Sequence, residues 1–490
     1  MDCCHVSRRQ ALRWAGLVAA TPLVAGAIDA APAVAAGTPA AGDLLVTDLE
    51  VVTVTDTSVV LTWFTGSSTA VDQYSRPAPV PADTEVLLGT PGSTAPLTTV
   101  LADQTPTAFH YAEVTGLEPG RPYTFAARSA GVAAAYSSLQ FPGPGGSVDA
   151  PYTFTTLTPP PGRHLFTIAL SNDWHHGEET SGIITGNFPP AFQQDAGLPP
   201  YTEVMAQATL ADVRQPDRGA HGLIVAGDLT AEAASTDAQQ MRQLLDSFGT
   251  LGHDYFVARG NHDRPHVGTT YDTCTVVPAA PDHHDCWGDA FGYRRQQLNT
   301  GQLGGLRLVG LDTTTLDDAN GELVPAQLAQ LTETLARDPE RPTLVFGHHP
   351  ITWESAVTTA AGPTFNLDPG NARSLESLYA RHPGVFFHHS GHTHRNRRTF
   401  AGEGDGGQGN PRVEYLEVAA TKEYPGGYAL LKVYSGGYQV NFYKTRSDLA
   451  RQWSQRTRGE YFGIYPHYTL GTIADRNHTV VRDLSGLHLA

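Results

Sequence analysis

Short apolar runs followed directly by polar, histidine-rich segments recur in the middle of this 490-residue chain. The runs are rich in β-branched and other apolar residues and predict buried strands at 165–170, 223–226, 255–258, 343–346 and 385–387. Polar side chains placed just beyond the carboxyl ends of buried strands are how an open α/β sheet builds an active site. We therefore expect an α/β domain whose polar segments meet at one rim.

The polar segments carry carboxylate, carboxamide and imidazole groups beside small or turn-forming residues. In chain order they are Asp173-Trp174-His175, Gly227-Asp228, Gly260-Asn261-His262-Asp263, Gly347-His348-His349-Pro350 and Gly391-His392-Thr393-His394. Oxygen and imidazole ligands without a thiolate favour hard or borderline metal ions, and there are enough of them for two. Singly, a Gly-Asp pair is usually a turn and Asn-His-Asp can cap a helix, but separate turns would not reproduce this order of ligand types. The pair His388-His389 continues the predicted strand 385–387, and we interpret it as structural.

This series resembles the calcineurin-like metallophosphoesterase superfamily, whose pattern runs D-x-H, G-D, G-N-H-D/E, H-x-P and G-H-x-H. The resemblance covers residues 163–447. It implies a fold of the α/β (α+β) class, a four-layer αββα sandwich in which two facing mixed sheets are flanked by helices. Helical apolar spacing predicts helices at 203–213, 236–248, 325–336 and 372–380, and β structure returns at 413–418 and 428–443.

The resemblance also implies a role for each polar segment. Asp173, His175 and His394 would bind a first metal ion, Asn261, His348 and His392 a second, and Asp228 would bridge the two. His262 would contact the phosphate and protonate the leaving group, with Asp263 as the local candidate for orienting it. His176 and His349 are our candidates for substrate contacts. The two ions would be divalent or trivalent, and Mn, Fe and Zn all suit this ligand set.

These residue types suit phosphate ester hydrolysis. Two ions held about 3.5–4 Å apart can share a hydroxide and clamp the phosphoryl oxygens during in-line displacement. Because only two aspartates face two dications, the centre with its bridging hydroxide keeps about one net positive charge, which suits an anionic ester.

The amino terminus predicts export. Ser7-Arg8-Arg9-Gln10-Ala11-Leu12 precedes an apolar run and the small residues at 33–36, which resembles a twin-arginine signal peptide spanning residues 1–36. We therefore expect a bacterial extracytoplasmic or secreted protein, without stable membrane insertion after signal removal. The alternative is a retained amino-terminal membrane anchor, although the run is short for a spanning helix.

Two cysteines, Cys274 and Cys286, remain after the predicted signal peptide. In an oxidising compartment they favour a disulfide that closes the intervening loop. Two other interpretations stay open at this stage: a catalytic thiol, or a zinc site formed by these cysteines with His283 and His284.

A separate all-β domain is expected at residues 42–157, joined by the proline-rich linker 158–162 to the domain at 163–447. Its segment Leu117-Glu118-Pro119-Gly120-Arg121-Pro122-Tyr123 resembles the corner of fibronectin type III sandwiches, with Trp63 in the place of their core tryptophan. Leu117 and Tyr123 would fill the sandwich, and the tyrosine hydroxyl would bond back to the chain. This sandwich either positions or shields the active site, binds an unspecified ligand, or acts as a spacer. Two inserts, 177–201 and 265–289, are expected to line the substrate pocket, and the extension 448–490 is expected to pack back on the second domain.

The domain layout also resembles that of purple acid phosphatases, but the sequence departs from that group. Ala231 stands where their metal-binding tyrosine would be, and His175 completes a D-x-H segment where they have D-x-G. The ligand pattern is closer to the phosphodiesterase branch, and the D-x-H form is compatible with both monoesters and diesters.

We conclude that the sequence predicts a secreted binuclear metallophosphoesterase that hydrolyses phosphate mono- or diesters by a metal-bridging hydroxide. The substrate would be a small-molecule phosphate ester, and the net charge of −17 argues against nucleic-acid binding. One alternative is a phosphodiesterase specific for nucleotides or glycerophosphodiesters. An alternative of another class is a binding module with an inactive phosphoesterase-like domain.

Overall fold

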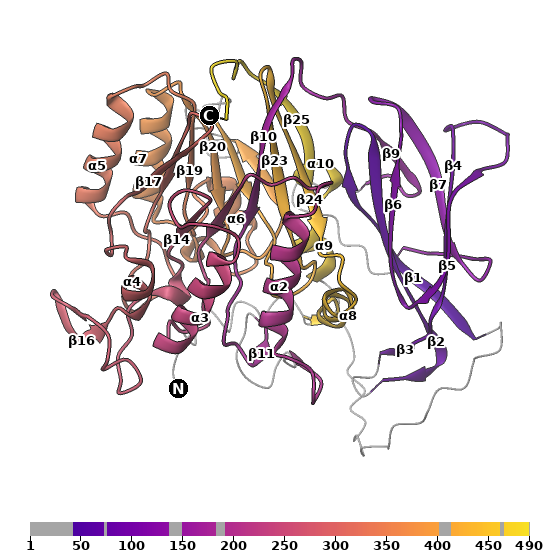
Figure 1. The fold of residues 1–490 in the computed structure, drawn as a ribbon, viewed down its shortest axis with the longest axis horizontal. Helices are drawn as coiled ribbons and strands as arrows, with labels where there is room; N and C mark the ends of the chain where they lie inside the picture. The colour runs from indigo at the N-terminus through magenta and orange to yellow at the C-terminus, as the bar shows by residue number, and fades with distance from the viewer. Residues whose placement is uncertain are drawn as a thin grey trace.

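The computed structural model describes residues 43–72, 76–136, 149–182, 192–400, 413–460 and 465–489 (Figure 1). The predicted signal peptide at 1–36 lies outside these residues, as does 183–191 of the first predicted insert. Within the described part of the chain, no helix is long and apolar enough to cross a membrane.

The amino-terminal part folds into two antiparallel sheets, seen at the right of Figure 1. One sheet contains β1 (Leu44–Val54), β2 (Ser58–Val71), β3 (Pro77–Pro79) and β6 (Phe109–Thr115). The other contains β4 (Ala82–Gly89), β5 (Thr98–Thr107), β7 (Pro122–Ser129), β8 (Val132–Ala133) and β9 (Thr153–Thr155). Trp63 lies in their shared core, and Leu117 and Tyr123 pack against it. The Tyr123 hydroxyl accepts a hydrogen bond from the Glu118 N–H at 3.1 Å, so it bonds back to the chain.

The second part contains two larger mixed sheets, as predicted. The first has the order β14 (Tyr255–Ala258), β13 (Gly222–Ala226), β10 (His164–Ser171), β23 (Gly427–Tyr434), β24 (Gly437–Lys444) and β25 (Asn477–Val481). The second has the order β17 (Asn299–Leu303), β18 (Leu306–Gly310), β19 (Thr343–Phe346), β20 (Val385–Ser390), β22 (Glu414–Glu417) and β21 (Arg397–Phe400). β10, β13 and β14 are parallel to one another, and so are β18, β19, β20 and β22. All five strands predicted ahead of the polar segments are present.

Helices cover the outer faces of the two sheets. They are α2 (Tyr201–Val213), α3 (Ser235–Asp246), α5 (Pro325–Ala336) and α7 (Pro369–Ala380), close to the four predicted helices. Leu210 of α2 and Met241 of α3 join the core that includes the first sheet, whereas α5 and α7 pack on the other face of the second sheet (Figure 1). The layers are therefore helix, sheet, sheet and helix. Short helices within connecting loops, α4 (Cys286–Phe291) and α6 (Trp353–Thr358), were not predicted.

The carboxyl-terminal extension packs back on this domain. It forms α8 (Asp448–Thr457), α9 (Tyr465–Leu470) and α10 (Ile473–Arg476), and then β25, which pairs with β24. The amino-terminal sheets also pack on the second domain, because Val52 of β1 and Val60 of β2 belong to its core. At this junction the Arg218 guanidinium donates to both carboxylate oxygens of Glu113, at 3.0 and 2.8 Å.

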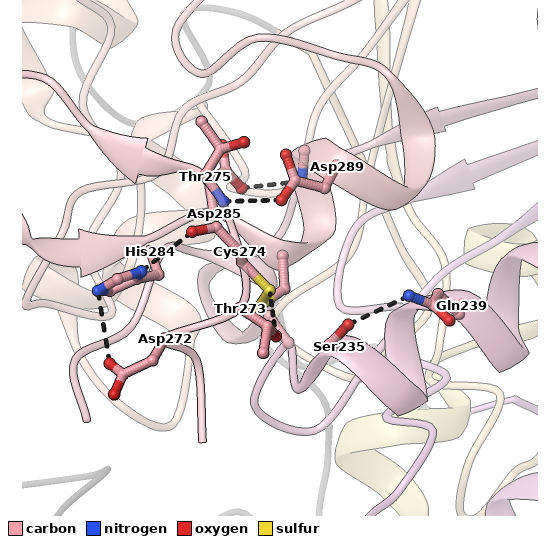
Figure 2. The surroundings of a disulfide bond; sticks show 12 residues. Ser235, Gln239, Asp272, Thr273, Cys274, Thr275, His284, Asp285 and Asp289 are labelled. Atoms are coloured by element: carbon pink, nitrogen blue, oxygen red, sulfur yellow. Dashed lines mark hydrogen bonds and ion pairs between the residues drawn. A yellow bond between two sulfur atoms is a disulfide. The ribbon is translucent and has the colours of Figure 1, made fainter. Parts of the chain in front are cut away.

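The second predicted insert is a disulfide-closed loop. Cys274 and Cys286 are bonded, with their Cα atoms 4.9 Å apart, and they enclose the hairpin of β15 (Val276–Val277) and β16 (Ala280–His284). Figure 2 shows Thr275 N donating to Asp289 Oδ2 at 2.8 Å and His284 beside Asp272. The predicted disulfide is confirmed. The alternatives of a catalytic thiol and of a zinc site with His283 and His284 are wrong, because both sulfur atoms are bonded to each other.

Candidate metal centre

The predicted polar segments meet at the rim formed by the carboxyl ends of β10, β13, β14, β19 and β20. Neighbouring parallel strands end at the same edge of a sheet, and the two sheets face each other, so segments far apart in sequence converge there. Thus the N–H of Asp173, after β10, donates to Gly227 O at 3.0 Å, after β13. The N–H of Gly391, after β20, donates to His348 O at 3.0 Å, after β19.

Four polar atoms crowd together on one side of the rim. His348 Nε2 lies 3.0 Å from Asn261 Oδ1, 3.0 Å from His392 Nδ1 and 3.1 Å from Asp228 Oδ2. We call the surroundings of these four atoms the Asn261 position.

A second group lies beside the first. Asp173 Oδ1 is 3.4 Å from His394 Nε2 and 4.0 Å from His175 Nε2. His175 Nε2 is in turn 3.4 Å from Asp228 Oδ2. We call the surroundings of these atoms the Asp173 position. Asp228 Oδ2 borders both positions, so the structure brings together all seven of the predicted metal ligands.

The donor set fits metal ions. Within the described chain, three groups of side chains have ligand atoms close enough to share an ion: Asp173, His175 and His394; Asp228, His348 and His392; and His175, Asp228 and His262. The buried His175 Nε2 has no hydrogen-bond partner among the described residues. Burial lowers the pKa of His175 to about 4, and it lowers the pKa of His392 well below its ordinary value. Both rings are therefore neutral at pH 7, which is the form of imidazole that binds metals.

The carboxylates of the site are held in their ionised form. Burial alone would raise the pKa of Asp228, but the neighbouring His348 and His262 lower it well below its ordinary value. Conversely, burial would lower the pKa of His348, but Asp228 raises it to about 9. A cation bound between these groups would displace that proton, as is usual when metals bind histidine.

The backbone at the site is strained. Asp173, His175, Asp228, His392 and His394 all have positive φ angles, of 52°, 46°, 51°, 70° and 54°. Non-glycine residues rarely adopt this region, because each instance costs about 1–3 kcal/mol and persists only where the surroundings enforce it. Such strain is typical of functional sites, because it directs into the site side chains that a relaxed backbone would point elsewhere.

Two glycines of the motifs are required by close packing. A Cβ atom on Gly260 would lie 2.1 Å from Asp228 Oδ1, and one on Gly227 would lie 2.6 Å from the His348 ring. Any larger residue at either position would displace a predicted ligand.

His262 lies where a proton-transferring imidazole is expected, but its orientation differs from the prediction. Its ring packs against His175 with centroids 4.4 Å apart. Its Nδ1 bonds to the Ala231 carbonyl at 2.7 Å, so this carbonyl orients the ring and leaves Nε2 facing the site. The expectation that Asp263 orients His262 is wrong.

Asp263 instead ties two ligand loops together. It is buried, and its Oδ1 accepts hydrogen bonds from Thr230 N at 2.9 Å and Thr230 Oγ1 at 2.7 Å. Its Oδ2 accepts hydrogen bonds from Leu229 N and Gly260 N, both at 3.0 Å. All its acceptor positions face backbone or Thr230, and none faces the His262 ring.

The two candidate substrate residues have different surroundings. His349 is buried, and its nitrogens bond to Thr313 Oγ1 at 2.7 Å and to Ala319 O at 3.0 Å. Both nitrogens are thus occupied inside the protein, which contradicts the predicted substrate contact. His176 is partly exposed beside the site, with Nε2 3.1 Å from Gln240 Oε1.

The sequence did not single out two carboxylates behind the ligands. Glu423 Oε1 bonds to His394 Nδ1 at 2.8 Å, and Glu178 Oε2 lies 3.4 Å from His175 Nδ1. Glu178 stands three residues after His175, and this short spacing could have predicted the contact from the sequence. Glu423 is 29 residues beyond His394 and belongs to no motif, so only the fold reveals its contact.

The chain matches one model of a protein family. Residues 166–396, a little under half of the chain, match the family model of the Calcineurin-like phosphoesterase. The chain contains a calcineurin-like phosphoesterase domain. The match spans all five polar segments. No curated protein matches the chain.

Three solved structures are similar to the chain at low identity. Purple acid phosphatase PPD1 from yellow lupin (Lupinus luteus) seeds has 13% identity and a TM-score of 0.42, covering 91% of this chain and 74% of that one. A dimetal phosphatase from Danio rerio has 12% identity and a TM-score of 0.39, covering 57% and 96%. PhoD has 10% identity and a TM-score of 0.35, covering 84% and 87%. With TM-scores this low, we draw no conclusion from these likenesses.

Proposed function

We propose that this chain is an extracytoplasmic phosphoesterase that hydrolyses phosphate mono- or diesters with two metal ions. The observation that carries the proposal is the shared carboxylate: Asp228 Oδ2 lies 3.4 Å from His175 Nε2 on one side and 3.1 Å from His348 Nε2 on the other. A single oxygen that borders two groups of ligands suits a pair of metal ions better than a single ion.

In this proposal, Asp173, His175 and His394 hold one ion, and Asn261, His348 and His392 hold the other, with Asp228 between them. When bound, the two ions would lower the pKa of water and offset the charge of the phosphate ester. The protein holds the ligand atoms in place beforehand through the strained loops and through Asp263, so that little reorganisation is needed.

His262 is the proposed proton-transferring residue. Because Nδ1 donates its hydrogen to the Ala231 carbonyl at 2.7 Å, the neutral ring presents the lone pair of Nε2, and the protonated ring presents an N–H there. Protonated His262 can therefore donate to a phosphoryl oxygen or to the leaving-group oxygen. Its ring is only partly exposed, which supports a position at the mouth of the site rather than in bulk solvent.

The proposed substrate is a small phosphate ester, and the acidic chain around the site bears on how it is bound. The net charge of −17 gives no general attraction for phosphate, so attraction has to come from the site itself. The disulfide fits an extracytoplasmic location, which is part of the proposal together with the twin-arginine signal. The fibronectin type III-like character of the amino-terminal sheets, and their role in positioning or shielding the active site, are proposed likewise.

The test compares hydrolysis and metal content. Full-length protein is loaded with Mn, Zn or Fe and offered a panel of phosphate monoesters and diesters. We expect two ions per chain and hydrolysis of at least one ester class. Asp228→Asn should abolish hydrolysis and lower the metal content. The matched control is Asp212→Asn, because Asp212 is also buried but bonds to Tyr428 at 2.9 Å, outside the site.

Two outcomes would count against the proposal. Wild-type protein that binds no metal at saturating concentrations would refute the metal centre. Wild-type protein that binds two ions but hydrolyses no ester would favour the alternative of a binding module.

A further inference from the structure

The imidazoles of the Asp173 position are supported from behind by carboxylates. Glu423 Oε1 bonds to His394 Nδ1 at 2.8 Å, and Glu178 Oε2 lies 3.4 Å from His175 Nδ1. A carboxylate behind a histidine fixes the ring orientation and the tautomer, so that Nε2 keeps its lone pair for the metal, and it raises the basicity of the ring.

The Asn261 position differs. His348 Nδ1 bonds to a neutral carbonyl, that of Ala226, at 2.9 Å. His392 Nε2, which faces away from the site, is buried and has no hydrogen-bond partner among the residues that the structure describes. Carboxylate support is therefore found at only one of the two positions.

One tripeptide contacts two ligand segments of the Asp173 position directly. We call Thr421-Lys422-Glu423 the support segment. The N–H of Thr421 donates to Asn172 O at 3.1 Å, and the N–H of Lys422 donates to Asp173 O at 3.2 Å. Glu423 bonds to His394, as described above. The segment therefore holds the backbone of Asp173 and the ring of His394 at once.

The side chain of Lys422 connects the two supporting carboxylates. Its Nζ donates to Glu178 Oε1 and Oε2 at 2.8 and 2.7 Å, and lies 3.6 Å from Glu423 Oε2. Lys422 is 1% exposed and Glu423 is fully buried. A buried lysine between two glutamates offsets their charge and holds both carboxylates in place.

The support segment is anchored by the carboxyl-terminal extension. Trp453 Nε1 in α8 donates to Lys422 O at 2.8 Å, and Tyr424 N donates to Thr457 Oγ1 at 2.8 Å. Both the segment and α8 lie beyond the residues that match the phosphoesterase family model, 166–396. The extension thus reaches the site through the main chain of residues 422–424.

We propose that the support segment, held by α8, positions the ligands of the Asp173 position and strengthens metal binding there and not at the Asn261 position. Glu423 is the positioning residue for His394, and the pair of Lys422 and Glu178 performs the same role for His175. This inference rests on the proposed function, because it takes the two positions to be metal sites.

The experiment measures metal affinity, not activity. Metal-stripped full-length protein is titrated with Zn²⁺ in competition with a chromophoric chelator, and bound zinc is counted by mass spectrometry. We expect the wild type to bind two ions. Glu423→Ala should weaken the binding of one ion by about 10–100-fold and leave the other unchanged. Glu423→Gln retains an oxygen that can accept from His394 Nδ1, so it should weaken the same ion less.

Glu414→Gln is the matched control. Glu414 is buried like Glu423 and also bonds to a histidine, His478 Nε2, at 2.6 Å, but this pair lies outside the centre. Its replacement should lower thermal stability and leave both zinc affinities unchanged. If the role of Glu423 were purely structural, Glu423→Gln would behave like Glu414→Gln: both would lower thermal stability and leave both zinc affinities unchanged.

Folded Glu423→Ala that binds both ions with wild-type affinity would overturn the inference. If Glu423→Ala does not fold, Glu178→Gln decides, since Glu178 is partly exposed and less critical to folding. Weaker binding of one ion by that variant supports the inference, and wild-type affinity for both ions overturns it. If the wild type binds fewer than two ions, the proposed function itself fails, which is a separate result.

Discussion

Replacing Asp263 by Asn tests the structural role that the fold assigns to this carboxylate. Its Oδ1 accepts from Thr230 N and Thr230 Oγ1, and its Oδ2 accepts from Leu229 N and Gly260 N. An amide group has one oxygen and one NH₂, so whichever way the substituted side chain turns, its NH₂ faces N–H donors on one side.

The less costly orientation places the NH₂ toward Thr230. The Thr230 hydroxyl can then rotate to accept from the NH₂, so among the backbone donors only the Thr230 N–H loses its partner. A buried donor without a partner costs about 1–3 kcal/mol. The opposite orientation would leave both Leu229 N–H and Gly260 N–H unpaired, at about twice that cost. We therefore expect Asp263→Asn to lose about 1–3 kcal/mol of stability and to loosen the loops that carry Asp228 and Asn261.

The assay is urea denaturation of the metal-free protein, followed by zinc titration of the folded protein. Asp263→Asn should unfold at lower urea and bind zinc more weakly. His262→Ala, by contrast, should retain metal binding and lose catalytic rate, because its side chain takes no part in joining the loops. If Asp263→Asn kept wild-type stability and metal affinity and lost only rate, as His262→Ala does, the assignment of Asp263 to loop joining would be refuted.

Four further outcomes are expected. Replacing Cys274 and Cys286 by Ser should cost about 3 kcal/mol, from the entropy of a loop with a sequence separation of 12, and unchanged thermal stability would contradict this. Burial raises the pKa of Glu50, but Lys444 and Arg458 lower it overall below its ordinary 4.5, so the contribution of Glu50 to stability is present above pH 4.5 and lost as the pH falls further. Glu50→Gln should therefore reduce the fall in melting temperature at acid pH. An unchanged fall would argue against this role. Chelation of bound metal should lower the melting temperature, because ligands that bind only the folded state stabilise it, and an identical melt with and without chelator would speak against a metal centre. Trp453→Phe, which removes the hydrogen bond to Lys422 O, should weaken zinc binding less than Glu423→Ala does, and a larger loss than that would point to a disturbed fold.

The predicted metal ligands depended on a simple property of parallel sheets. A short apolar run followed by a polar turn marks a strand end, and strand ends of neighbouring parallel strands share one rim. The strand ends therefore predict that the five polar segments meet, although they are spread over about two hundred and twenty residues. The family resemblance implied which side chains in these segments bind metal.

The errors have an equally physical origin. Asp263 and His349 each stand beside a predicted site residue in sequence, and we gave them roles at the site for that reason. In a turn, however, neighbouring side chains point in different directions, so adjacency along the chain says little about adjacency in space. Asp263 faces the backbone of the next loop, and His349 faces Thr313 and Ala319.

By itself the sequence determined the main strands and helices, the residue types that line the rim and the disulfide pairing, because each follows from local periodicity, from the order of the motifs or from the count of available groups. The order of the layers was implied by the family resemblance. Only the tertiary structure decided which groups stand behind the ligands. Glu423 reaches His394 and Lys422 reaches Glu178 across long stretches of chain, through a segment that α8 holds in place. Such contacts carry no local pattern, since they depend on how the carboxyl-terminal extension packs and not on any repeat in the chain.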